Sequence, residues 1–153
     1  MLDTGEQVRI LMADDDPDDR MMTDQALHQS RLMNCIGFVE DGQDLMDYLR
    51  HSGKYLDVEL FPLPDLILLD LNMPRKDGRE ALAEIKSDPT LRRIPVVVLT
   101  TSKAEEDILR SYDLGVNAYI TKPVSFQGLV DAMRVLSMFW FELVKLPNGG
   151  ATA

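Results

Sequence analysis

Five short apolar runs, each followed by a stretch with helical spacing, constrain the fold of this sequence more than any other feature. The runs span residues 8–13, 35–39, 66–69, 96–99 and 118–120. The candidate helices follow them at about residues 18–29, 43–50, 79–86, 104–114 and 126–144. Strands that alternate with helices are typical of right-handed βαβ units around a parallel sheet. The pattern therefore predicts an α/β fold, with a doubly wound five-stranded parallel sheet and helices on both faces.

The length of 153 residues suits one domain with a full hydrophobic core. We expect residues 1–147 to form this single domain, with an extended C-terminal helix. Residues 148–153 are expected to form a flexible tail, because Gly149 and Gly150 mark its start. Residues 52–64 make a long connection that contains Tyr55, Leu60 and Phe61. This apolar content predicts a packed excursion rather than a disordered linker.

The charge of the chain restricts its partners. The 16 basic and 26 acidic residues give a net charge of −10, which repels nucleic acid and anionic membranes. No apolar run approaches the ~20 residues that span a bilayer, and a single cysteine, Cys35, fits a reducing cytoplasm. We therefore expect a cytoplasmic domain that acts through a partner protein, with no nucleic acid and no membrane.

Polar side chains follow four of the predicted strands where each strand ends. In a doubly wound sheet the carboxyl ends of the strands form the ligand site, so these side chains should converge. They are Asp14, Asp15 and Asp16 after the first strand, Asp70 after the third, Thr100 ending the fourth and Lys122 near the end of the fifth. Helix capping and the helix dipole explain Asp16, Asp18 and Asp19 without a ligand role.

These residue types together indicate phosphoryl transfer. Bunched carboxylates repel one another unless a hard cation lies among them, and Mg²⁺ binds one or two carboxylates with waters and phosphate oxygens. A carboxylate such as that of Asp70 is also a nucleophile that can form an acyl phosphate. Such a transfer needs in-line positioning and neutralisation of charge, which Mg²⁺, Lys122 and Thr100 would supply.

Over about residues 8–144 the sequence resembles the receiver domains of two-component response regulators. The matching motifs are Asp14-Asp15, the phosphoacceptor motif Asp70-Leu71-Asn72-Met73-Pro74, Asp77-Gly78, Thr100 and Lys122-Pro123. The resemblance implies a flavodoxin-like sheet with strand order 2-1-3-4-5. It also implies that the domain accepts a phosphoryl group from a histidine kinase and switches conformation to alter protein–protein contacts. Such a domain catalyses only its own phosphorylation and dephosphorylation.

The resemblance assigns the phosphoryl acceptor and the metal ligands. Asp70 is the phosphorylated nucleophile. Asp15 and Asp70 bind Mg²⁺ directly, together with the main-chain carbonyl of Asn72. Asp14 acts mainly through water, and it departs from the glutamate that is common at this position in the family.

The resemblance also assigns the residues that sense the phosphoryl group. Lys122 pairs with that group, and Thr100 is the switch hydroxyl drawn toward it. Tyr119 is the aromatic side chain that turns inward with Thr100. The family usually has a cis peptide at the position of Lys122-Pro123, and only a bond to proline makes that isomer accessible.

Two further features resemble the single-domain regulators paired with phytochrome-type histidine kinases. One is the LTTS string at residues 99–102, together with residues 111–126. The other is the long connection at residues 52–64, together with the aromatic tail at residues 138–147. The implied partner is therefore a histidine kinase, here of the phytochrome type.

Two other classes of protein are weighed against this interpretation. A flavodoxin-like electron carrier would need a Ser/Thr/Gly-rich phosphate loop after the first strand, where this chain has three aspartates. The alternative that stays open is a non-phosphorylated pseudo-receiver, which acts as an interaction module. Such proteins have typically lost part of the acid pocket, the lysine or the threonine, and all are present here.

The last predicted helix carries more apolar residues than one buried face requires. Its stripe consists of Leu129, Met133, Leu136, Trp140 and Leu143, at the spacing of a helix that covers a sheet. Outside this stripe remain Met138, Phe139, Phe141 and Val144. These residues predict a homodimer through the last helix. The alternative is that they pack on residues 52–64 or cap the core.

Overall fold

The computed structural model describes residues 8–29, 34–71, 73, 75–100, 103–110, 115–116, 118–123 and 125–136. Its strands are β1 (Val8–Ala13), β2 (Asn34–Val39), β3 (Leu66–Asp70), β4 (Val96–Thr100) and β5 (Ala118–Thr121). Its helices are α1 (Pro17–Gln29), α2 (Gly42–Leu49), α3 (Gly78–Ser87) and α4 (Lys103–Arg110), with the short 3-10 helices η1 (Gly53–Tyr55) and η2 (Leu91–Arg93). Residues 126–136 are also helical. Residues 111–114 and 137–144, which end the last two predicted helices, lie outside the described residues.

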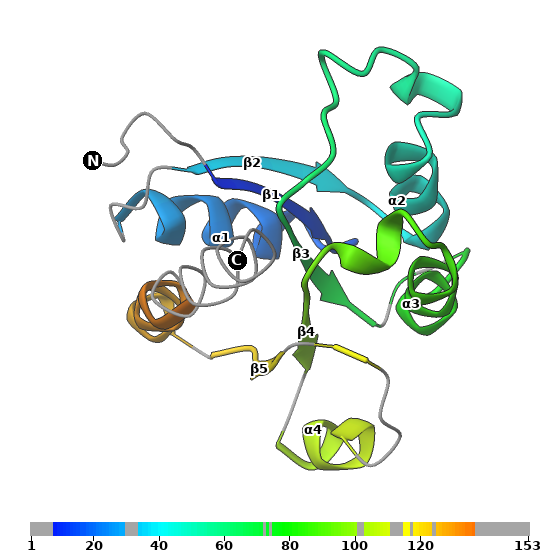
Figure 1. Ribbon diagram of the computed structural model, residues 1–153. Coiled ribbons are helices and arrows are strands. Elements are labelled where there is room, and N and C mark those ends of the chain that lie inside the picture. The colour runs from blue at the N-terminus through cyan, green and yellow to red at the C-terminus, as the bar shows by residue number, and fades with distance from the viewer. Residues whose placement is uncertain are drawn as a thin grey trace, which may run out of the picture.

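The five strands form one parallel sheet in the order β2-β1-β3-β4-β5 (Figure 1). This order confirms the predicted flavodoxin-like, doubly wound arrangement. In its register Asp70 lies opposite Leu99, and Thr100 lies opposite Thr121. The polar residues that end β3, β4 and β5 are therefore neighbours along one edge of the sheet.

Alternating residues of the strands face two separate apolar clusters. Leu11, Ile67 and Val98 belong to the cluster that also contains the buried faces of α2 and α3. Met12 and Leu68 belong to the cluster that contains the buried residues of α1 and of the helix at residues 126–136. Figure 1 shows these two pairs of helices on opposite sides of the sheet. The inner strands β3 and β4 are buried along their whole length, which explains why their sequences are apolar rather than alternating.

Side-chain caps fix where the helices near the site begin. The Asp16 carboxylate accepts a hydrogen bond from the Asp18 backbone N–H at 2.9 Å, as its place before Pro17 predicts. Asp41 caps α2 in the same way by accepting from the Asp44 N–H at 2.8 Å. Because both helices begin directly after a strand, these caps also fix the loops at the carboxyl edge of the sheet.

The connection at residues 52–64 is packed through its aromatic residues. Tyr48, Tyr55 and Phe61 contact one another ring to ring, with centroids 4.9 to 5.7 Å apart. The Tyr55 hydroxyl, in a residue only 5% exposed, donates to the Asp44 carboxylate at 2.7 Å. The packed part of the excursion does not include Leu60, which lies in a turn and is 70% exposed.

The helix at residues 126–136 covers the sheet with part of its predicted stripe. Met133 and Leu136 are buried and Leu129 is half-buried. Val130, which the stripe omits, is buried as well. Trp140 and Leu143 lie outside the described residues, as do Met138, Phe139, Phe141 and Val144. None of the helices in the described part of the chain is long and apolar enough to cross a membrane.

Candidate functional site

The carboxyl edge of the sheet brings three of the predicted ligand residues together. One carboxylate oxygen from each of Asp14, Asp15 and Asp70 lies within 4.8 Å of the other two. Asp14 follows β1 and is fully buried, whereas Asp70 ends β3 and is 5% exposed. Asp15 is exposed. The cluster therefore has a buried side formed by two strands and an open side toward solvent.

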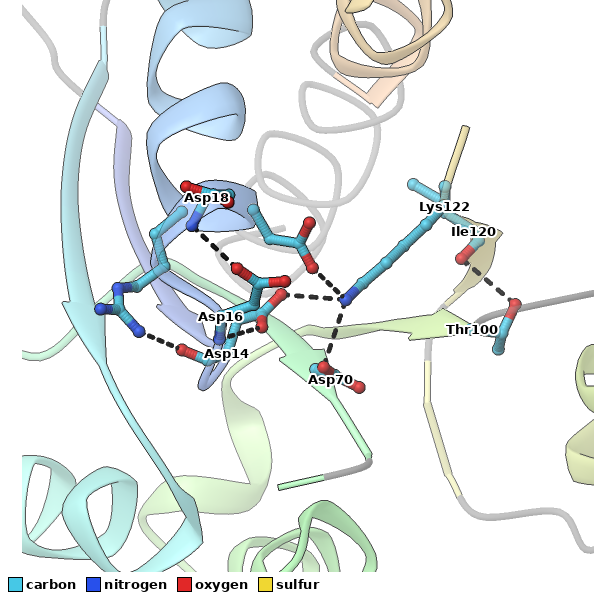
Figure 2. Close-up of polar contacts among 9 residues, drawn as sticks. Asp14, Asp16, Asp18, Asp70, Thr100, Ile120 and Lys122 are labelled. Atoms are coloured by element: carbon cyan, nitrogen blue, oxygen red, sulfur yellow. Dashed lines mark hydrogen bonds and ion pairs between the residues drawn. The ribbon is translucent and has the colours of Figure 1, made fainter. Parts of the chain in front are cut away.

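The ammonium of Lys122 lies among these carboxylates. Its Nζ is 3.0 Å from Asp14 Oδ2 and 3.2 Å from Asp70 Oδ2 (Figure 2). It is also 2.8 Å from Asp19 Oδ2, in the first turn of α1. Capping and the helix dipole do not account for that contact. Sequence reasoning did not place Asp19 in the pocket, because its contact depends on how α1 packs on the sheet.

Burial and charge set the ionisation of the pocket. Burial raises the pKa of Asp14 to about 6, and the hydrogen bonds from the Asp16 N–H and Lys122 only partly oppose that rise. Burial lowers the pKa of Lys122, but the carboxylates of Asp19, Asp14 and Asp70 outweigh it and raise that pKa above its usual value. At neutral pH one ammonium therefore faces several carboxylates, and the pocket keeps an excess of negative charge.

These residues fit a divalent cation. Buried carboxylates cost free energy unless a positive charge or hydrogen bonds compensate them, and a single ammonium does so only in part. Hard cations such as Mg²⁺ and Mn²⁺ prefer carboxylate, carbonyl and water oxygens, and Asp14, Asp15 and Asp70 offer three such oxygens in one place. The main-chain ligand predicted at Asn72 lies outside the described residues.

Thr100, the last residue of β4, lies on the same edge and is fully buried. Its hydroxyl points toward the Ile120 carbonyl oxygen, 3.4 Å away (Figure 2), and lies 3.3 Å from the Thr121 hydroxyl. Thr121 in turn donates to Glu106 of α4 at 3.2 Å, and Glu106 is only 6% exposed. Sequence reasoning missed Thr121 and Glu106. For Glu106 one indication was available. It lies three residues before Leu109 on the same face of α4, and Leu109 is buried.

The two remaining predicted positions lie beside this chain of hydrogen bonds. Tyr119 is half-buried in β5, and its hydroxyl donates to the Leu109 carbonyl oxygen of α4 at 3.3 Å. The predicted cis peptide at Lys122-Pro123 is wrong, since none of the described residues has a cis peptide bond. The trans isomer is intrinsically favoured for a bond to proline, and Lys122 reaches the carboxylates from it.

Known proteins resemble this chain in both sequence and fold. Residues 10–134 match the family described as the response regulator receiver domain. Response regulator Rcp1 of Synechocystis is 45% identical over 138 residues, which cover 90% of this chain and 92% of Rcp1. The crystal structure of the phosphorylated cyanobacterial phytochrome response regulator RcpA has a TM-score of 0.78 at 48% identity, covering 89% of this chain and 95% of RcpA.

A second solved structure extends the similarity to a metal-bound protein. The Mn²⁺-bound form of Rcp1 has a TM-score of 0.75 at 44% identity, covering 88% of this chain and 95% of that structure. The predicted resemblance to phytochrome response regulators is thereby confirmed. The family match extends over most of the chain, and it includes β2 to β5 and most of β1, the strands that build the carboxylate pocket. The chain therefore belongs to the receiver-domain family of two-component response regulators.

Proposed function

We propose that this receiver domain accepts a phosphoryl group from a histidine kinase on Asp70. A carboxylate oxygen of Asp70 forms the new bond to phosphorus while the bond from phosphorus to the kinase imidazole nitrogen breaks. That nitrogen keeps the electron pair and takes a proton from solvent, and Asp70 becomes an acyl phosphate. The observation that carries the proposal is the convergence of Asp14, Asp15, Asp70 and Lys122 at one edge of the sheet.

Mg²⁺ is the proposed cofactor, held directly by Asp15, Asp70 and the main-chain carbonyl of Asn72, with Asp14 acting mainly through water. When bound, it supplies positive charge that offsets the carboxylates and the phosphoryl oxygens. The three clustered carboxylates support this assignment, as does the Mn²⁺-bound form of the related Rcp1.

The switch is proposed to run through Lys122, Thr100 and Tyr119. Lys122 pairs with the phosphoryl group, and Thr100 moves toward it. Because the Thr100 hydroxyl contacts Thr121, that movement would break the hydrogen-bond chain that leads to Glu106 of α4. Tyr119 donates to the backbone of the same helix, so both contacts couple the pocket to α4.

Phosphate incorporation tests the proposal against the alternative of a pseudo-receiver. The protein is incubated with Mg²⁺ and either a phosphorylated kinase or a small acyl phosphate. We expect one acid-labile, hydroxylamine-sensitive phosphoryl group per chain. If no phosphoryl group is incorporated with any donor, the chain is a pseudo-receiver that acts as an interaction module.

Replacement of Lys122 by alanine should separate phosphoryl transfer from metal binding. The variant loses a phosphate contact, so we expect its phosphorylation rate at saturating Mg²⁺ to fall by on the order of 100-fold. Its Mg²⁺ affinity should equal or exceed that of the wild type, because the change removes a cation and keeps the carboxylates. Rates of incorporation and Mg²⁺ titration measure the two effects.

Lys54→Ala is the matched control for this variant. Lys54 is an exposed lysine of η1 that lies 4.0 Å from the Asp44 carboxylate, so its loss should leave phosphorylation and Mg²⁺ affinity near the wild-type values. A Lys122→Ala variant that loses Mg²⁺ binding and phosphorylation in equal measure would contradict the assigned role.

The proposed partner is a phytochrome-type histidine kinase in the cytoplasm. RcpA, a phytochrome response regulator, supports this partner through its 48% identity. The net charge of −10 supports a protein partner over nucleic acid or a membrane, and the lone Cys35 fits a reducing compartment.

Self-association through the last helix is also proposed. Its support is the surplus of apolar residues in the sequence at Met138, Phe139, Phe141 and Val144, beyond the stripe that covers the sheet. Sedimentation of the wild type should show a dimer at tens of micromolar, and Phe141→Glu should stay monomeric, each measured with and without a phosphoryl donor. Monomers in every sample would show that these residues serve the core or the kinase contact instead.

A further inference from the structure

The loop that follows the phosphoryl acceptor is tied to the start of α2 by two contacts. Arg75 donates from Nε to Asp41 Oδ2 at 2.7 Å and from Nη2 to Asp41 Oδ1 at 3.0 Å. The Gly42 N–H donates to the Lys76 carbonyl oxygen at 2.7 Å. Residues 75 and 76 are therefore fixed to the helix cap that follows β2, on the same edge of the sheet as the carboxylate pocket.

The backbone at Arg75 is strained. Its φ of 60° lies in the left-handed region, which side chains with a Cβ rarely adopt. Such a conformation persists only where the surrounding structure holds it, and it is found at functional sites. Here the paired hydrogen bonds to Asp41 hold it. Asp41 is itself fixed, because its carboxylate also accepts from the Asp44 N–H.

The other end of the loop is packed against Asp70. The Gly78 N–H donates to the Leu71 carbonyl oxygen at 3.0 Å. A Cβ at Gly78 would lie 2.7 Å from the Asp70 carbonyl oxygen and 2.5 Å from Leu71 Cα, so only glycine fits there. This end of the loop is therefore fixed closely against the phosphoryl acceptor.

We propose that Arg75 and Asp41 are positioning residues for the metal and phosphoryl site. They fix residues 75 and 76 against the cap of α2 and, with Gly78 packed on Asp70, they hold the Asp70 carboxylate toward the cation that Asp14 and Asp15 would also face. The inference rests on the proposed function, because the metal site is part of it. The pair acts through geometry rather than charge. Its guanidinium engages both carboxylate oxygens, which an ammonium cannot do in the same way.

Arg75→Gly separates positioning from stability. Glycine adopts the left-handed backbone without strain, so we expect the melting temperature to stay within a degree or so of the wild type or to rise. The ion pair is lost, so Mg²⁺ affinity measured by calorimetric titration should fall by about 3- to 10-fold, less than for residues that hold a metal ligand directly. If Arg75 only stabilised the fold, the melting temperature and the Mg²⁺ affinity would fall together.

Two further variants test the pairing. Arg75→Lys keeps the charge but loses the paired geometry, so it should also bind Mg²⁺ more weakly than the wild type. Asp41→Asn keeps an oxygen to cap α2, and it should weaken Mg²⁺ binding by a similar factor. In a double variant with Arg75→Gly, Asp41→Asn should cause no further loss of Mg²⁺ affinity, because both changes remove the same interaction.

Arg134→Ala is the control. Arg134 forms an exposed ion pair with Asp131 at 3.3 Å within the helix at residues 126–136, away from the loop at residues 75–77. Its Mg²⁺ affinity should match the wild type. An Arg75→Gly variant that binds Mg²⁺ as tightly as the wild type would overturn the inference. A wild type that binds no Mg²⁺ would overturn the proposed metal site, which is a different result.

Discussion

Asp70→Asn is expected to abolish phosphorylation. The amide has the size of the carboxylate but lacks its nucleophilic oxygen, so no acyl phosphate can form. Wild-type protein with Mg²⁺ and a phosphoryl donor should gain one phosphoryl group, detected as a mass increase that acid and hydroxylamine remove. The variant should show no increase under the same conditions.

Asp131→Asn is the matched control for this loss. Asp131 pairs with Arg134 at 3.3 Å on the helix at residues 126–136 and lies outside the carboxylate cluster. Its variant should be phosphorylated to the same extent as the wild type. A phosphoryl group that still appears on Asp70→Asn, with the same lability, would assign the acceptor to another carboxylate.

The strands and the site could be predicted because both depend on local pattern and on topology. Apolar runs such as 66–69 and 96–99 mark buried inner strands. In a parallel sheet every strand ends at the same edge, so a residue that follows a strand can be assigned to the site without coordinates. This reasoning placed Asp14, Asp70, Thr100 and Lys122 correctly.

Contacts made by side chains across elements could not be predicted in this way. Asp19 lies in a helical turn, where capping and the dipole give a sufficient local reason for an aspartate. Its contact with Lys122 depends on how α1 packs on the sheet. The pairing of Arg75 with Asp41 depends on a left-handed backbone at Arg75, and no sequence pattern at an arginine indicates that conformation.

The crowded carboxylates of the pocket should make stability sensitive to Mg²⁺. Lys122 pairs with Asp14, Asp19 and Asp70, and Asp15 adds a further carboxylate to the cluster, so one ammonium leaves the repulsion only partly offset. Mg²⁺ binds the folded site and hardly binds the unfolded chain. At about 100 times its Kd it should raise the free energy of unfolding by about 2.7 kcal/mol. For a domain of this size that corresponds to a rise in Tm of roughly 5–10 °C.

Asp15→Asn should uncouple stability from the metal. Asp15 is exposed, so without metal the variant should melt slightly above the wild type, because one repelling charge is gone. With Mg²⁺ it should gain less, because a direct ligand is lost. Asp57→Asn is the control. Asp57 is an exposed carboxylate outside the pocket that accepts from the Glu59 N–H, so its variant should respond to Mg²⁺ as the wild type does.

Thermal melts at matched ionic strength distinguish binding at the site from screening. A monovalent salt screens the carboxylates of the wild type and of both variants alike. It should therefore raise Tm only slightly, and by a similar amount in the wild type, Asp15→Asn and Asp57→Asn. A specific site instead gives a Tm that rises with Mg²⁺ in the wild type and in Asp57→Asn, and much less in Asp15→Asn. If the wild-type Tm is the same in Mg²⁺ as in the monovalent salt, the three carboxylates do not form a metal site. Asp14 and Asp70 would then be explained by their ion pairs with Lys122, and Asp15 by its exposed position in the bend before α1.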